Sequence, residues 1–251
     1  MQIDFEAVEE GVYVVTLNRP ERMNALDSAG KKRLAQIWLE AEHNAAVRAL
    51  VVRGAGPRAF CAGSDIKEIQ ESGEMVTTRI LADAIPSIGV RLTKPVIAAL
   101  HGYAIGMGLT LAIHCDVRIA APGSTLGFPE VQHGMLSAIS AVNLPGIIGE
   151  PAALDLMLSA RLVDAREALA MGLIHQIQDD PYAAALVLAK RMAGHSAAAM
   201  RLTKQLILSE RERRIDAHFA LVDSARERVT DSEEYGDVVA HKPGAGRVRP
   251  S

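Results

Sequence analysis

Short apolar runs alternate with stretches of helical spacing along this chain. Runs long enough for buried strands extend from Val12 to Leu17, from Ala49 to Val52 and from Val96 to Leu100. Between the first two, apolar residues recur at helical spacing and form the buried stripe of a helix that begins at Asp27 or Ser28. This alternation of strands and helices predicts an α/β fold.

The run that ends at Leu100 is followed by a glycine turn and an apolar helix. Gly102, Gly106 and Gly108 lie in this turn, which predicts a unit of strand, turn and helix. The first amides of such a helix have no intrahelical partner, and the helix dipole favours a negative group there. The spacing fits neither the GxxxxGK[ST] nor the GxGxxG phosphate-binding pattern. Taken alone, the turn is equally compatible with simple punctuation between a strand and a helix.

A second strand end has the same character. The segment FCAGSDIKE, from Phe60 to Glu68, contains small residues and then a helix start with Ser64 or Asp65 as the cap. If the two turns lie side by side, two backbone amides bind one oxygen between them. This is the geometry of an oxyanion hole.

Several motifs together resemble the crotonase (enoyl-CoA hydratase/isomerase) superfamily. They cover most of the chain, roughly Val12 to Ser209, and read VVTLNRPERMNAL, FCAGSDIKE, HGYAIGMGLTLAIHCD, STLGFPEVQHG and ARLVDAREALAMGLIHQI. The resemblance implies a crotonase-like spiral of repeated strand-strand-helix units with a helical C-terminal region. It also implies an acyl-CoA thioester substrate, whose enolate oxygen is held by the amides of Ala62 and Met107.

The resemblance, with one departure from the family pattern, leaves a single acid/base residue. Glu130 ends the motif LGFPE and matches one catalytic glutamate of the family, although Leu126 replaces an aromatic residue there. Thr110 stands where the well-known hydratases have the second glutamate, and a neutral hydroxyl is no base at neutral pH. One carboxylate is enough to move a proton between two carbons. We therefore favour an isomerase or another one-carboxylate reaction, such as a lyase or decarboxylase; a non-catalytic acyl-CoA-binding protein is the alternative outside enzymes.

Substrate-binding residues are expected in the same motifs. By resemblance they are Arg22, Ala62, Gly63, Ser64, Asp65, Ile66, Gly106, Thr110 and His133. Arg22 belongs to a basic cluster with residues 31–33, which is either a solvated helix face or a contact for the phosphates of CoA. His133 either lines the pocket or faces solvent. Serine and alanine replace the usual glycines and proline after Glu130, so the pocket is expected to differ in shape.

Composition narrows the remaining classes. The chain has 251 residues, 49% of them hydrophobic, and a formal net charge of −3, so neither nucleic acid nor an anionic membrane is an expected partner. No apolar run approaches about 18 residues and the N-terminus is acidic, which predicts a cytoplasmic protein. Cys61 and Cys115 have no metal-site spacing, and Cys61 is either a nucleophile or a buried thiol. We expect no metal and no cofactor apart from the CoA of the substrate.

Weaker patterns predict the remaining loops, helices and regions of the chain. Gln70 to Thr78 lacks periodicity and predicts a mobile loop, and the helical spacing from Arg79 to Leu92 is interrupted at Pro86. Further on, we expect two short helices in 151–171, a strand in 173–177, and helices in 182–192 and 196–229. The division expected is a core in 1–194 and an oligomerisation region in 195–251 that forms trimers or dimers of trimers, with a disordered tail in 242–251.

Overall fold

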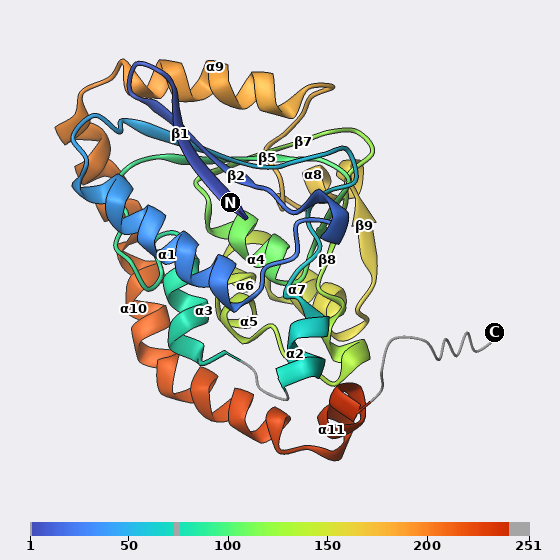
Figure 1. The fold of residues 1–251 in the computed structure, drawn as a ribbon. Helices are drawn as coiled ribbons and strands as arrows, with labels where there is room; N and C mark the ends of the chain where they lie inside the picture. The colour runs from blue at the N-terminus through green and yellow to red at the C-terminus, as the bar shows by residue number, and fades with distance from the viewer. Residues whose placement is uncertain (1, 73–75, 241–251) are drawn as a thin grey trace.

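A computed structural model describes residues 2–72 and 76–240, which form two sheets and the helices around them (Figure 1). The six-stranded sheet has the order β1-β2-β3-β5-β7-β10, and the four-stranded sheet has the order β4-β6-β8-β9. β1 is antiparallel to β2 and β9 is antiparallel to β8, whereas the other neighbours are parallel. The strands are β1 (Ile3–Glu9), β2 (Val12–Leu17), β3 (Ala49–Gly54), β4 (Ala59–Cys61), β5 (Val96–Leu100), β6 (Tyr103–Ile105), β7 (Val117–Ala120), β8 (Thr125–Gly127), β9 (Leu162–Asp164) and β10 (Gln176–Ile177).

Successive turns of the chain repeat one arrangement, which is the predicted spiral. Each repeat places one strand in the large sheet, the next in the small sheet, and then a helix or 3-10 turn: β3, β4 and α2 (Ile66–Ser72), then β5, β6 and α4 (Met107–His114), then β7, β8 and η2 (Pro129–His133). The bend between β5 and β6 is sharp. Gly102 has a φ of +53°, and a Cβ there would lie 2.0 Å from the carbonyl oxygen of Arg58, so only glycine fits.

Both faces of the large sheet are covered, as a parallel sheet requires. On one face, alternate residues such as Val51 and Ile97 pack against α9 (Pro181–Ala193), which lies along the top of the molecule in Figure 1. The opposite face packs against the main core with α1 (Ser28–His43) and α4. Trp38 of α1 is fully buried, and its indole N–H donates to the carbonyl of Ala84 at 2.9 Å.

Helix boundaries follow local capping where it is present. Asp27 caps α1 as predicted, because its carboxylate accepts from the amide of Gly30 at 2.7 Å. The loop predicted from Gln70 to Thr78 is wrong at both ends: α2 continues to Ser72 and α3 (Thr78–Ala84) begins at Thr78. Residues 73–75 lie outside the described residues. The helical pattern predicted to Leu92 ends instead at Ala84, before Pro86.

The second half of the chain is mainly helical. It contains α5 (Ala138–Asn143), α6 (Pro145–Ile148), α7 (Glu150–Leu158), α8 (Ala165–Ala170), α10 (Ala197–Thr230) and α11 (Glu233–Ala240). α10 runs back along α3 and α5, and α11 packs against α2 and η2 near the opposite end of the molecule (Figure 1). The predicted disordered tail, 242–251, lies outside the described residues, and the division of the chain at 194 stays a prediction.

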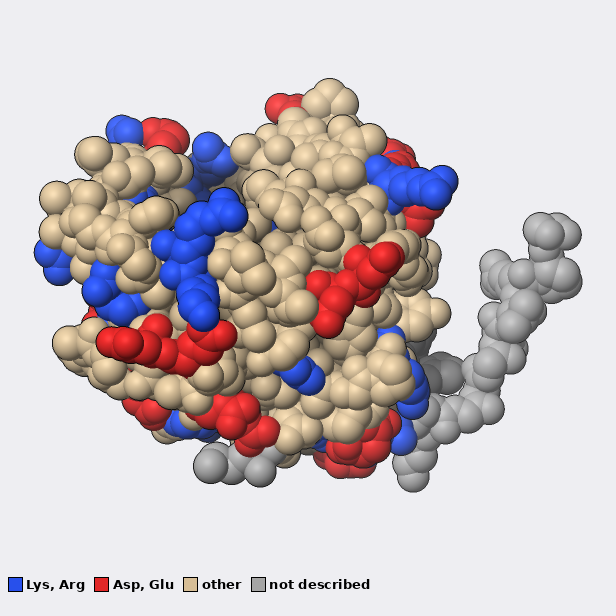
Figure 2. Space-filling view, turned by 90° about the horizontal axis from the view of Figure 1, so that it is seen from above, with Lys and Arg blue, Asp and Glu red and all other residues tan. Residues whose placement is uncertain are grey.

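The surface charges of the described residues do not indicate a partner beyond those expected from the sequence. On the face that α9 covers, acidic and basic side chains are interspersed over a largely uncharged surface (Figure 2). Within 2–72 and 76–240, no helix combines the length and the hydropathy that crossing a bilayer requires.

Candidate active site

A pocket of about 190 Å³ opens where the small sheet meets α1, α2 and α3. It brings together the predicted residues Ala62, Gly63, Ser64, Ile66, Gly106, Met107, Thr110, Glu130 and His133. Two further predicted residues are not part of its lining. Arg22 is exposed at the end of the 3-10 turn Pro20–Arg22, and the carboxylate of Asp65 pairs with Arg19 at 3.0 Å.

The two glycine-rich turns lie side by side because they follow the paired strands β4 and β6. Gly63 has a φ of +107°, and the position of a Cβ there is 3.7 Å from the amide nitrogen of Met107. Gly108 packs against the same segment, because its Cβ position is only 2.2 Å from the carbonyl oxygen of Cys61. Close backbone contact of this kind excludes side chains and lets amides from both turns reach one point.

Not every amide of the first turn is free. The amide of Ala62 donates to the carbonyl of Met23 at 3.0 Å, so the prediction that Ala62 supplies an oxyanion-hole donor is not supported. Leu26 accepts from the amide of Asp65 at 3.0 Å and donates to the carbonyl of Gly63 at 2.8 Å. The amide of Ser64 stands between these two bonds, and no acceptor for it is found among the described residues.

The second turn provides the other free amide. Met107 is the first residue of α4, where an amide has no intrahelical acceptor, and none is found for it elsewhere in the described chain. Its N-cap, Gly106, has φ +55° and ψ −121°, a conformation that only glycine adopts readily. Ser64 and Met107, whose amides have no acceptor among the described residues, both line the pocket.

Glu130 brings a carboxylate to the same place. It lies in the 3-10 turn η2, and its Oε1 is 3.0 Å from the position of a Cβ at Gly106. Its Oε2 is buried and has no hydrogen-bond partner among the described residues. Burial raises the pKa of Glu130 to about 7, and a hydrogen bond from Ser137 opposes this rise. A carboxyl group with this pKa both accepts and returns a proton near neutral pH.

Thr110 belongs to a cluster of hydroxyl groups. Its Oγ1 donates to the carbonyl of Gly106 at 3.0 Å and lies 2.7 Å from the hydroxyl of Ser140 and 3.4 Å from that of Ser137. These serines come from the segment after Glu130 that differs from the family pattern. Position 110, where the well-known hydratases have a second glutamate, therefore carries a hydroxyl group that lies among other hydroxyl groups.

Three buried titratable groups near the site are not suited to proton or group transfer. His114 is buried beneath Thr110, and desolvation lowers its pKa to about 3, so it is neutral. Cys61 and Cys115 are fully buried, and desolvation raises the pKa of each thiol to about 12. The structure therefore favours the buried-thiol interpretation of Cys61 over a nucleophile.

Two cationic side chains that the sequence did not predict as pocket residues line the pocket. The sequence placed Lys31 either on a solvated helix face or in contact with the phosphates of CoA, whereas in the structure it is 2% exposed and lines the pocket. Arg226 of α10 also lines the pocket, where its guanidinium donates to Thr78 at 2.9 Å and to the carbonyl of Val76 at 2.7 Å. The order of charges along α1 and α10 carried no signal for either, because their burial depends on helices distant in the sequence.

Known proteins share both the sequence and the fold. The family model described as "Enoyl-CoA hydratase/isomerase" matches residues 7–235. An (E)-benzylidenesuccinyl-CoA hydratase from Thauera aromatica is 34% identical over 202 residues, covering 79% of each chain. A short-chain-enoyl-CoA hydratase from Clostridium acetobutylicum is 32% identical over 236 residues, covering 92% of this chain and 90% of the relative.

Solved structures agree with these relatives. An enoyl-CoA hydratase/isomerase from Mycobacterium paratuberculosis has a TM-score of 0.84 at 27% identity, covering 95% of this chain and 97% of that one. A carnitinyl-CoA dehydratase from Mycobacterium avium 104 has a TM-score of 0.85 at 26% identity, covering 99% of both. The predicted fold and family are confirmed: the chain belongs to the enoyl-CoA hydratase/isomerase family.

Proposed function

We propose that this enzyme, of the enoyl-CoA hydratase/isomerase type, acts on an acyl-CoA thioester through an enolate. The amides of Ser64 and Met107 hold the thioester oxygen, and Glu130 transfers the proton. The observation that carries the proposal is the buried, unpartnered Oε2 of Glu130 in the same pocket as two free amides. No cofactor is proposed apart from the CoA that forms part of the substrate.

The proposed chemistry moves one proton and one electron pair at a time. Glu130 takes the proton from the carbon next to the thioester carbonyl, and the C–H electron pair becomes the enolate double bond while negative charge moves to the carbonyl oxygen. Two amides and the positive end of α4 stabilise that charge, and one such donor contributes about 3 kcal/mol. With a 3-enoyl substrate, Glu130 then returns the proton two carbons further along, which moves the double bond into conjugation.

Isomerisation is favoured because one carboxylate is enough for both proton transfers, and Oε2 of Glu130 has no hydrogen-bond partner among the described residues. Glu68 also lines the pocket, but its carboxylate accepts from the amide of Ser28 at 2.8 and 3.1 Å and is held there. Hydration is the second candidate. It is supported by the hydroxyl cluster of Thr110 and Ser140, which provides hydrogen-bonding groups for a water, and by relatives that are named hydratases.

The assembly is also a proposal. α10 exposes large apolar side chains, and those of Leu202, Leu206, Ile207 and Leu221 are each more than half exposed. Exposed apolar positions along one long helix are typical of an interface. We propose a homotrimer or a dimer of trimers built through this helix, and sedimentation analysis of the purified chain tests it. A monomer at micromolar concentration contradicts the proposal.

Turnover of a panel of CoA thioesters tests the catalytic proposal. The panel contains 2-enoyl, 3-enoyl, aromatic enoyl and branched malonyl thioesters, and it is run with the native chain, Glu130→Gln and the exposed control Glu6→Gln on β1. We expect one class to turn over and Glu130→Gln alone to lose at least about 100-fold. Full activity of Glu130→Gln excludes it as the acid/base. Tight binding without turnover, indifferent to the substitution, supports a binding protein instead.

A further inference from the structure

Lys31 is a buried cation that the proposed proton transfer does not use. It lies in the first turn of α1 and is 2% exposed. The pocket that it lines also has apolar side chains from α2, from α3 and from the residue after α3, among them Ile69, Leu81 and Ile85. A lysine in such surroundings loses the hydration of its ammonium group. A methionine or leucine would fill the same space without that penalty, so packing alone does not explain the choice.

The ammonium group is only partly satisfied by its own chain. Its Nζ donates one hydrogen bond, to the carbonyl of Leu26 at 2.8 Å, although an ammonium has three N–H donors. Within the described part of the chain, no carboxylate oxygen lies within ion-pair distance of it. Desolvation accordingly lowers the pKa of Lys31 below its ordinary value, even though acidic residues nearby oppose this.

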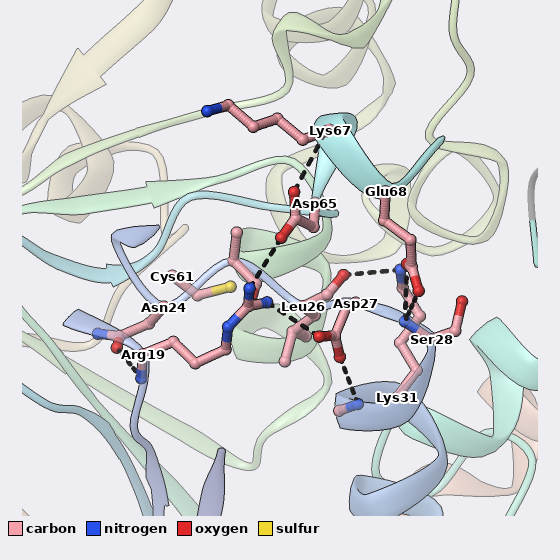
Figure 3. Close-up of polar contacts among 12 residues, drawn as sticks. Arg19, Asn24, Leu26, Asp27, Ser28, Lys31, Cys61, Asp65, Lys67 and Glu68 are labelled. Carbon is pink, nitrogen blue, oxygen red and sulfur yellow. Dashed lines mark hydrogen bonds and ion pairs between the residues drawn. The ribbon is translucent and has the colours of Figure 1, made fainter. Parts of the chain in front are cut away.

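Those acidic residues are held by other donors, as Figure 3 shows. Arg19 pairs with Asp27 at 3.1 Å and with Asp65 at 3.0 Å. The carboxylate of Glu68 accepts twice from the amide of Ser28, so it is fixed at the N-terminus of α1. No second acceptor for the Lys31 ammonium group is found among the described residues, so two of its N–H donors are unpaired beside the pocket that the residue lines.

Lys31 is also tied to the proposed oxyanion hole. The carbonyl of Leu26 accepts from both Lys31 Nζ and the amide of Asp65, the residue after Ser64. The ammonium group and the turn at Ser64 are therefore held by the same carbonyl, on the side of the pocket to which α1, α2 and α3 contribute. A thioester held at Ser64 and Met107 has its acyl group in the pocket that Lys31 also lines.

We propose that the acyl group of the substrate carries a second, free carboxylate, and that Lys31 binds it. This inference rests on the proposed function, because it assumes a thioester held at Ser64. A carboxylate accepts the free N–H donors and supplies the missing countercharge, which is the arrangement that makes a buried cation favourable. Lys31 is then the residue that selects a carboxylated acyl group over a neutral one.

Direct binding to the native chain tests the inference without any variant. Calorimetry compares pairs of saturated thioesters of equal chain length that differ only in a terminal methyl or carboxylate, such as butyryl- and succinyl-CoA, hexanoyl- and adipoyl-CoA, and octanoyl- and suberoyl-CoA. We expect the carboxylated member to bind at least about 10-fold more tightly at one length. If the neutral member binds as tightly at every length, the inference fails while the proposed function stands. If no thioester binds, the proposed function fails as well.

Kinetics of variants separate recognition from a structural role. Lys31→Met is compared with Lys32→Met, a control at the exposed neighbouring position. With hexenoyl-CoA and its terminally carboxylated counterpart, we expect Lys31→Met to lose about 10- to 150-fold in kcat/KM on the carboxylated substrate only, mainly through KM. Equal losses on both substrates, together with a lower Tm, assign Lys31 a structural role and overturn the proposal.

A thioester without the nucleotide identifies which anion Lys31 meets. Carboxylated pantetheine thioesters lack the phosphates of CoA but keep the acyl group. We expect the penalty of Lys31→Met to persist with them. Disappearance of the penalty shows that Lys31 contacts a CoA phosphate and contradicts an acyl carboxylate.

Discussion

The charge of Glu130 is predicted to govern activity and stability in opposite directions. Burial raises its pKa from 4.5 to about 7, so the folded protein holds its proton over a pH range in which the unfolded chain releases it. Glu130 therefore favours the folded state most below about pH 4.5, and this contribution is lost as the pH rises to about 7. In the folded protein, the carboxylate needed for proton abstraction forms around pH 7.

The magnitude follows from these two pKa values. At 1.36 kcal/mol for each pH unit, ionising Glu130 in its buried position costs the folded state about 2.5 kcal/mol more at pH 8 than at pH 5. Glu130→Gln removes this cost because its amide does not ionise. For a chain of this size the gain corresponds to about 5 to 10 °C in Tm at pH 8 relative to pH 5.

Two assays check the prediction. Thermal unfolding at pH 5 and pH 8 compares the native chain, Glu130→Gln and the exposed control Glu6→Gln, for which we expect a difference from the native chain that does not change with pH. In parallel, kcat/KM of the native chain is expected to rise about tenfold per pH unit below pH 7 and then level off. A Tm difference between the native chain and Glu130→Gln that is equal at both pH values refutes the buried charge, and an activity profile that is flat between pH 5.5 and 8 refutes its role as the base.

Three further predictions concern the turns and the thiols. Met107→Pro removes an amide at a helix position that tolerates proline, so we expect kcat to fall about 10²- to 10³-fold. Met107→Ala keeps the amide and is expected to stay near native activity. Equal loss in both variants contradicts the use of this amide. Gly106→Ala places a Cβ 3.0 Å from Glu130 Oε1 at a φ of +55°. We expect a lower Tm in thermal unfolding and a lower kcat in the turnover assay. An unchanged kcat argues that the Glu130 carboxylate does not lie against Gly106 in the active enzyme. Cys61 and Cys115, with pKa values raised to about 12, are expected to resist alkylation by iodoacetamide at pH 7.5 in the native state and to react after unfolding, as mass spectrometry shows; rapid native labelling contradicts their burial.

The sequence was most informative where structure depends on continuous local patterns. β2 and β5 have the bounds predicted for them, because each is an unbroken apolar run that ends at a turn. β6, β8 and β9 were missed because each has only three residues and no distinct pattern. Their pairing creates the small sheet, so the placement of the two turns required the tertiary structure.

Within the site, the sequence located the turns but not every donor. Whether Ala62 or Ser64 has the free amide depends on Met23 and Leu26, which lie far back in the chain. The basic neighbours of Lys31 left it either on a solvated helix face or in contact with the phosphates of CoA, whereas in the folded protein it is buried and lines the pocket. Such errors arise because burial is decided by distant segments.

The place of Arg226 in the pocket has a consequence for how the protein is made. This side chain bonds Thr78, a residue 148 positions earlier, and the helix after it packs against α2 and η2. The described strands of both sheets all precede α10 in the chain, so they leave the ribosome before this wall of the pocket does. The pocket is therefore complete only after residue 226 has left the ribosome, and a chain that stops before this position lacks part of the pocket wall.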